Sequence, residues 1–142
     1  MNLDSIRAHC LSFPHVTEQI QWGDDLLFKV GGKMFAVMPL EPAPVCLSFK
    51  CSEEKFAELL EIEGIIPAPY MARNKWVALQ HFDALRDHEL RQLLRQSYDL
   101  VFAKLPKKKQ AELAATNRRI QTKSKARSRP SLGPELRVAS KR

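Results

Sequence analysis

The sequence has no hydrophobic run long enough to cross a membrane and no recognisable targeting segment. A membrane-spanning helix needs about 20 consecutive apolar residues, and no part of the chain comes near that length. The first residues, Met1 to Asp4, have neither the basic nor the apolar region of a secretory signal. We therefore expect a cytoplasmic protein that has no membrane anchor.

Paired cysteines are also missing. The three cysteines, Cys10, Cys46 and Cys51, are odd in number and have no paired spacing, which favours free thiols in a reducing compartment over a disulfide framework. They form no CxxC motif, and the four histidines form no HxxxH motif: His9, His15, His81 and His88. We expect no metal site and no bound cofactor.

The patterns that carry catalysis are absent as well. Gly31-Gly32-Lys33 lacks the spacing of a phosphate-binding P-loop, and a tight turn accounts for both glycines. Asp24 and Asp25 are adjacent, so in a strand their carboxylates would point to opposite faces, and a turn is the better interpretation. Because no nucleophile with a base, paired carboxylates or phosphate cradle is evident, we expect a protein that is not an enzyme.

What the sequence has instead is a strong asymmetry of charge. The net charge is +7, but 12 of the 23 Lys and Arg lie between Lys107 and Arg142, together with only 2 acidic residues. Residues 1–106 carry the other 11 basic and 14 acidic side chains, so this part is mildly acidic. From residue 122 onward large apolar residues are few, and such a segment cannot bury enough surface to offset its ordering entropy. We expect a folded domain over residues 1–115 and a basic, disordered tail over residues 116–142.

A β-hairpin is the clearest local signal. In "LLFKVGGKMFAVM", residues 26–38, two apolar runs flank Gly31-Gly32. Glycine accepts the positive φ that a two-residue hairpin turn requires, so the segment predicts two antiparallel strands.

The other elements follow from periodicity. Apolar spacing predicts helices over residues 3–10, from Ser52 to before Gly64, over 84–104 and, more briefly, after Pro106. Alternation predicts strands over residues 45–50, with Cys46, Ser48 and Lys50 on a polar outer face, and over residues 75–80. This order indicates an α+β fold in which helices pack on one face of an antiparallel sheet. The expected core includes Phe28, Phe35, Trp76, Leu93 and Tyr98.

The stretch "PAPYMARNKWVAL", residues 67–79, allows two interpretations. In a strand, Trp76 and Ala78 share one face, whereas Lys75, Val77 and Leu79 share the other. In the first interpretation Tyr70 and Trp76 pack onto the sheet and the cations are solvated. In the second, Arg73 and Lys75 contact phosphates while Tyr70 or Trp76 offers a ring to a base or sugar.

Several motifs together resemble one known family. The segments "FPHVTE", "WGDDLLFKVGGKMFAV", "GIIPAPYMARNKWVAL" and "LLRQSYDLVFAKLPKK" occur in the order typical of the MmcQ/YjbR family of small bacterial proteins. The resemblance covers roughly residues 1–110. It implies a frataxin (CyaY)-like α/β fold and DNA binding by a double wing of hairpins. Iron binding is not expected, because the first helix offers only Asp4 as a carboxylate.

The candidate DNA-binding residues are the cations on the predicted strands and in the basic segment. They are Lys29, Lys33, Lys50, Arg73, Lys75, Lys107, Lys108, Lys109, Arg118 and Arg119. A flexible basic segment binds nucleic acid with little sequence preference and with a steep dependence on salt. Two alternatives stay open: a tail that only solubilises the protein, and a small-ligand or protein-interaction module that uses a groove near Tyr70 and Trp76.

Overall fold

The computed structural model describes residues 1–41, 44–69 and 71–115. Contacts divide the chain into a unit of Met1–Pro106 and a second unit that begins at Lys107. The helices of the first unit are α1 (Leu3–Leu11), α2 (Glu53–Leu59) and α3 (Asp87–Ala103), with short 3₁₀ turns η1 (Ala72–Asn74) and η2 (Phe82–Ala84). The strands are β1 (Val16–Gln21), β2 (Asp25–Val30), β3 (Lys33–Pro39), β4 (Leu47–Lys50), β5 (Ile65–Pro67) and β6 (Trp76–Leu79). In the second unit residues 107–115 are helical. The expected boundary after residue 115 stays a prediction, and the expected tail lies outside the described residues.

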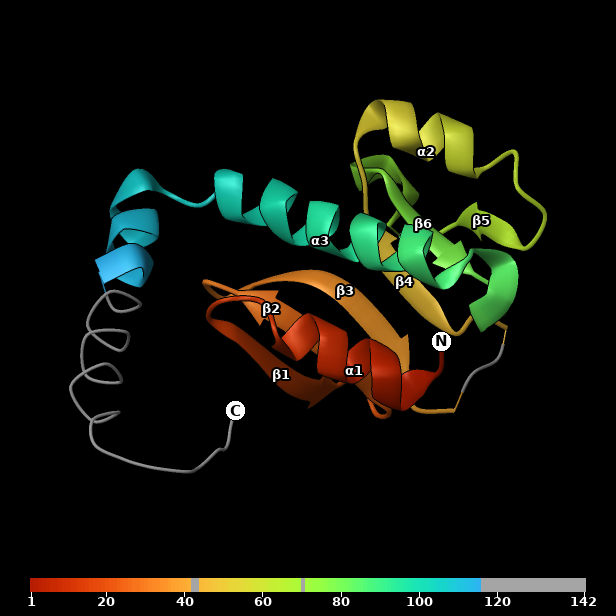
Figure 1. Ribbon diagram of the computed structural model, residues 1–142, viewed down its shortest axis with the longest axis horizontal. Helices are drawn as coiled ribbons and strands as arrows, with labels where there is room; N and C mark the ends of the chain where they lie inside the picture. Colours follow the sequence, from red (N-terminus) through yellow and green to blue (C-terminus); the bar gives the residue numbers. More distant parts are fainter. Residues whose placement is uncertain (42–43, 70, 116–142) are drawn as a thin grey trace, which may run out of the picture. The chain divides into compact units, whose positions relative to one another are not determined.

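The strands form one antiparallel sheet in the order β1-β2-β3-β4-β6-β5 (Figure 1). The predicted hairpin is confirmed, because Val30 pairs with Lys33 across Gly31 and Gly32, whose φ angles are +60° and +83°. Two strands were not specified by the sequence patterns: β1, which is mostly polar, and β5, which has only three residues.

The helices cover one face of this sheet, as expected (Figure 1). The ring of Phe28 on β2 packs against Phe35 on β3. Phe35 in turn meets Tyr98 of α3 edge to face, with the ring centres 5.7 Å apart. The predicted apolar stripe of α3 is buried: Leu90, Leu93, Leu94, Tyr98 and Val101. Each of the five expected core residues is buried, so the core prediction is confirmed.

The opposite face has no α-helix of the described residues against it, yet it is not uniformly polar. Leu27, Val37, Trp76 and Ala78 form a second apolar cluster, against which Met34, Ile66 and Met71 pack. The chain after β5 therefore lies against this face. The expectation of a polar outer face on β4 is wrong, since Cys46 and Ser48 are both buried. The reason is the position of β4 in the middle of the sheet, where chain covers both of its faces.

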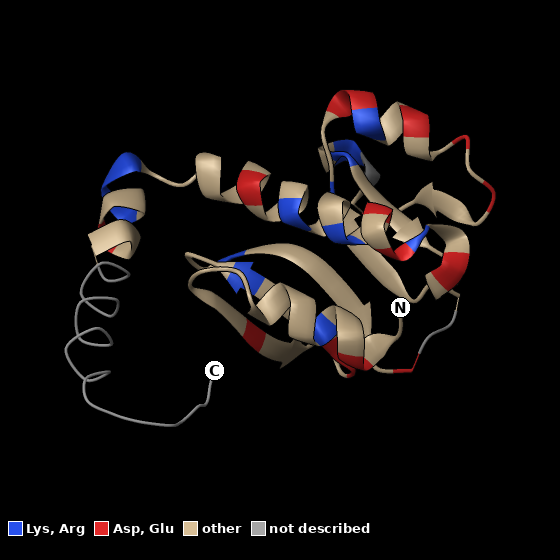
Figure 2. Cartoon of the chain, viewed as in Figure 1, with Lys and Arg blue, Asp and Glu red and all other residues tan. Residues whose placement is uncertain are grey.

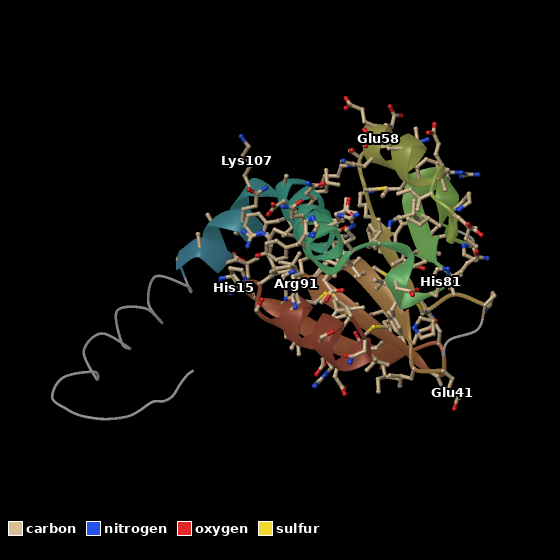
Figure 3. The ribbon with its side chains drawn as sticks, turned by 45° about the vertical axis from the view of Figure 1, so that its right-hand side comes forward. His15, Glu41, Glu58, His81, Arg91 and Lys107 are labelled. Atoms are coloured by element: carbon tan, nitrogen blue, oxygen red, sulfur yellow. The ribbon has the colours of Figure 1, made fainter. Side chains whose placement is uncertain are left out.

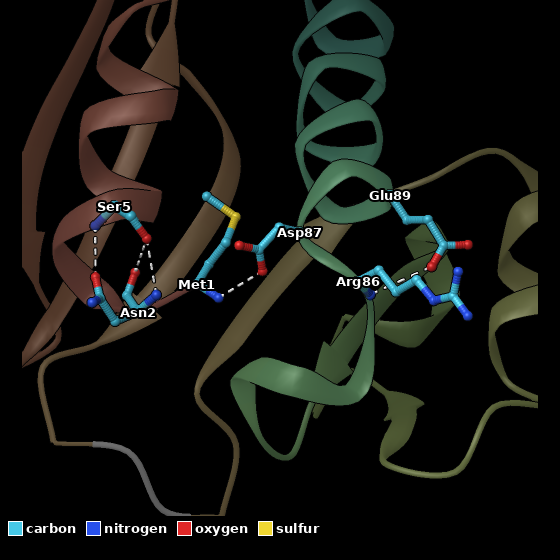
Figure 4. A network of polar contacts seen from close by, with 6 residues as sticks. All are labelled: Met1, Asn2, Ser5, Arg86, Asp87 and Glu89. Carbon is cyan, nitrogen blue, oxygen red and sulfur yellow. Dashed lines mark hydrogen bonds and ion pairs between the residues drawn. The ribbon is translucent and has the colours of Figure 1, made fainter.

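The N-terminus is fixed to α3 by polar contacts (Figure 4). Asn2 caps α1, its side-chain oxygen accepting from the Ser5 backbone N–H at 2.8 Å, while Ser5 Oγ accepts from the Asn2 N–H at 2.9 Å. The terminal ammonium of Met1 donates to Asp87 at 2.9 Å and lowers the pKa of that carboxyl group. These contacts hold α1 and α3 together over the sheet.

Acidic residues gather at one end of the first unit. The exposed carboxylates of α2 and of the turn after it are Glu53, Glu54, Glu58, Glu61 and Glu63 (Figure 2). Glu58 projects outward from α2 (Figure 3). The β2–β3 turn, the end of β4 and the end of α3 lie outside this acidic cluster.

Candidate nucleic-acid interface

Three lysines from three elements converge on one pocket at the end of the sheet. Lys33 begins β3, Lys50 ends β4, and Lys104 follows α3. They line a pocket of about 360 Å³, which we call the lysine basin, together with Met34, Asn74, Trp76, Val101 and Leu105. None of the described residues that line it is acidic. The basin thus combines an apolar floor with cations from three directions.

Lys50 is held by hydrogen bonds of both its side chain and its backbone carbonyl. Its Nζ donates to the backbone oxygen of Asn74 at 3.0 Å, and its own carbonyl accepts from the hydroxyl of Ser97 on α3. Burial lowers the pKa of Lys50, and the nearby charge of Lys104 lowers it further. Both effects disfavour the charged form of Lys50. An anion bound in the basin would stabilise that charged form.

Sequence reasoning placed Lys33 and Lys50 on strands but did not single out Lys104. The helical prediction ran to residue 104, so the signal available was a cation at the end of a helix next to Leu105-Pro106. Only the packing of α3 over β3 brings that cation to the basin. Lys29, by contrast, donates from β2 to the side-chain oxygen of Gln19 on β1 at 2.8 Å and does not line the basin.

Arg73 and Lys75 differ from one another. Arg73 is exposed in η1, as expected. Lys75 is partly buried, and its Nζ lies 5.1 Å from the centre of the Phe56 ring on α2. Lys75 directly precedes β6 and has a positive φ of +63°, so strand alternation alone does not set the direction of its side chain. The expectation that Lys75 is solvated beside Arg73 therefore needs correction.

The remaining candidates fall in two groups. Lys107, Lys108 and Lys109 are exposed on the helix of residues 107–115. Tyr70, Arg118 and Arg119 lie outside the described residues, so their proposed roles stay predictions. Trp76 is only 5% exposed, which makes its ring part of the basin floor and of the core. It is not a free surface for a base, so a ligand in the proposed groove could not stack on it.

A second pocket lies on the sheet face opposite the α-helices. Its volume is about 490 Å³, and its lining residues, which define what we call the apolar pocket, are Trp22, Asp25, Met34, Val37, Pro39, Val45, Ser48, Pro69 and Met71. Met34 lines this pocket and the lysine basin alike. The two hollows are therefore neighbours.

Trp22 stands at the rim of the apolar pocket in an unusual conformation. It has φ +54° in the turn between β1 and β2, and it is 64% exposed. A bulky side chain at positive φ is an outlier that costs free energy, and such strain is frequent at functional positions. Sequence reasoning treated "WGDD" only as a turn and missed this ring.

Burial makes the three cysteines poor nucleophiles. It raises the pKa of Cys10 to about 12 and the pKa values of Cys46 and Cys51 to about 11. Within residues 1–41, 44–69 and 71–115, no three His, Cys, Asp or Glu residues come together as metal ligands. In the same residues, no helix combines the length and the apolar character needed to cross a membrane.

Comparisons with known proteins agree with the sequence resemblance. The model of the YjbR family matches residues 11–100. A crystal structure of a Deinococcus radiodurans protein with a DUF419 domain superposes with a TM-score of 0.73 at 30% identity, covering 80% of this chain and 88% of that one. A Pseudomonas syringae protein superposes with a TM-score of 0.60 at 19% identity, covering 70% of this chain and 98% of that one. None of the curated proteins matches the chain with significance.

Proposed function

This chain belongs to the YjbR family, and on that premise we propose that it is a non-enzymatic DNA-binding protein. It holds the phosphate backbone in the lysine basin, and the basic segment after residue 106 adds affinity that does not depend on sequence. One observation carries the proposal: Lys33, Lys50 and Lys104 come from separate elements to one pocket, and none of the described residues that line this pocket is acidic.

The charge distribution supports DNA binding at the lysine basin and away from α2. Residues 1–106 carry three more acids than bases, so the first unit as a whole does not attract a polyanion. The five exposed carboxylates of α2 and its following turn would repel phosphates (Figure 2). DNA is therefore directed to the end of the sheet that holds the lysines, and the affinity of this unit alone is modest.

We assign the double wing that the family resemblance implies to two segments beside the lysine basin. The β2–β3 hairpin is one wing, with Lys33 directly after its glycine turn. The second contact is the loop of Arg73 and Asn74, since Asn74 lines the same basin as Lys33. The frataxin (CyaY)-like topology and a cytoplasmic location likewise remain expectations from the resemblance and the sequence.

The decisive experiment replaces cations in matched sets. One variant of the full-length protein carries Lys33→Ala, Lys50→Ala and Lys104→Ala. The control carries Lys55→Ala, Arg86→Ala and Arg91→Ala, which remove the same charge from residues that do not line the basin. Titration with a short duplex at several salt concentrations should show weaker binding by the basin variant. Its slope of log K against log salt should fall by about 0.9 for each phosphate that the variant no longer neutralises. An equal reduction of affinity in both variants would refute a localised interface.

A second candidate function has its own support. The apolar pocket is large enough for a small organic molecule, so a ligand-binding module on this face is the alternative, with DNA binding incidental. It would use Met34 and Met71 more than Trp76. This alternative gains if the basin variant binds duplex DNA as well as the natural protein does at every salt concentration.

A further inference from the structure

The lysine basin and the apolar pocket together present cations, an apolar surface and a carboxylate in an order that is complementary to a nucleotide. Cations lie at one end, around Lys50 and Lys104, and Met34 belongs to both hollows. The middle is formed by Met34, Val37 and Met71, and the carboxylate of Asp25 lies on the far side. A nucleotide has the matching order of an anionic phosphate, an apolar base face and a base edge that carries hydrogen-bond donors.

Strand geometry sets the spacing between these regions. Ser48 and Lys50 lie on the same face of β4, two residues apart, which in a strand is about 7 Å. Ser48 lines the apolar pocket and Lys50 lines the lysine basin. That separation suits the span from a backbone phosphate to the base of the same nucleotide.

Two polar residues line the apolar pocket, Ser48 and Asp25. Ser48 is 5% exposed, and its hydroxyl can both donate and accept a hydrogen bond. Asp25 forms no ion pair with any described residue, and its carboxylate accepts hydrogen bonds. Together the two groups can pair with a base that presents both donors and acceptors.

The exposed ring of Trp22 supplies a stacking surface at the rim. It is the more exposed of the two tryptophans, 64% against 5% for Trp76. Base stacking on an aromatic side chain contributes about 1–3 kcal/mol per base and tolerates every sequence, because each base has a π face. The positive φ of Trp22 keeps a large ring at a turn where glycine or asparagine would be less strained.

We propose that the apolar pocket receives one unpaired base of a DNA strand whose phosphate lies in the lysine basin. This inference rests on the proposed function and makes it more specific. In a duplex the base is stacked and paired and cannot enter. The protein should therefore prefer single-stranded DNA, or a duplex with an unpaired nucleotide, over a fully paired duplex.

The test compares three labelled probes of equal length on the full-length protein at one salt concentration. They are a single strand, its duplex, and a strand of abasic sites that keeps the phosphates but has no bases. The single strand should bind about 10-fold more tightly than either of the others, as expected for one stacked base. Tryptophan emission should be quenched by the single strand alone.

Variants separate the base from the phosphate. Trp22→Asn removes the ring at a position where asparagine tolerates the positive φ, so folding is preserved. Its single-strand preference should disappear. Ile20→Asn is the matched control, because Ile20 is 58% exposed but shares the helix-covered side of the sheet with its partner Leu26. The control should keep the preference.

The outcomes distinguish the two proposals. If the single strand, the abasic strand and the duplex bind equally, the base pocket is refuted while the DNA-binding proposal stands. The same conclusion follows if Trp22→Asn keeps the natural preference. If none of the probes binds, the proposed function fails, and the inference fails with it.

Discussion

Gly31 lies directly against Leu105. A Cβ placed on Gly31 would fall 2.6 Å from Leu105 Cδ1, so the turn of the β2–β3 hairpin and the chain after α3 meet at a point where a methyl group has no space. Leu105 is itself buried and lines the lysine basin. This contact fixes Lys33 and Lys104, one on each side of it, at the same end of the sheet.

The two glycines of this turn provide a matched pair of substitutions. Gly32→Ala should lower the free energy of unfolding by about 1–2 kcal/mol, the cost of a side chain at positive φ, since nothing lies within 4 Å of its Cβ position. Gly31→Ala should cost more, because Leu105 must also move. Denaturant melts of both variants measure the difference. Leu105→Ala should reduce the excess cost of Gly31→Ala, whereas equal costs of the two glycine variants would exclude the contact as a constraint.

Trp76 should be a structural residue. It is buried in the cluster with Leu27, Val37 and Ala78, and a large-to-small change at such a position costs about 3–5 kcal/mol. We expect Trp76→Ala to lower the free energy of unfolding by that amount in a urea melt. A change near zero would mean that the ring contributes little to packing and is available for binding.

Removal of the basic segment should change the dependence of DNA binding on salt. A truncation to residues 1–115 deletes 9 of the 12 cations that follow residue 106 and leaves Lys107, Lys108 and Lys109. The expected result is weaker duplex binding and a flatter slope of log K against log salt. The truncated protein should retain weak, basin-dependent binding at low salt. If it binds no DNA there, the folded unit contributes nothing and the ligand-binding alternative replaces the proposal.

Lys50 should lose its proton at a lower pH in the folded protein than in the unfolded chain. Its pKa in the folded protein is below 10.5, the ordinary value that applies to the unfolded chain. Between the lowered pKa and 10.5 the unfolded state binds more protons, so this group makes stability rise with pH in that window. Phosphate binding requires the charged form, so DNA affinity should fall in the same window.

The comparison of Lys50→Arg with the natural protein tests this assignment. A guanidinium group stays charged throughout that range, so the variant should keep the DNA affinity that the natural protein loses there. Titrations of a duplex at a series of pH values measure the effect. The same decline in both proteins would show that the loss of affinity does not come from Lys50.

Local sequence determined most of the secondary structure of this protein. Gly31-Gly32 between apolar runs specified the hairpin, and the leucine spacing of α3 specified the helix and its buried stripe, because turn conformation and apolar periodicity are properties of neighbouring residues. The faces of Trp76 and Val77 also followed from strand alternation. β1 and β5 did not, since a polar edge strand and a strand of three residues carry too weak a pattern.

The candidate site was decided by tertiary structure. Lys33 and Lys50 were identifiable as cations on strands, but Lys104 joins them only because α3 packs across the sheet, and Lys75 departs because α2 places Phe56 beneath its charge. The buried Ser48 looked like a surface residue, because alternation gives the face of a strand but not what lies over that face. Periodicity reflects how neighbours in sequence are arranged. Pockets depend on which distant segments meet, and that depends on how the whole core packs.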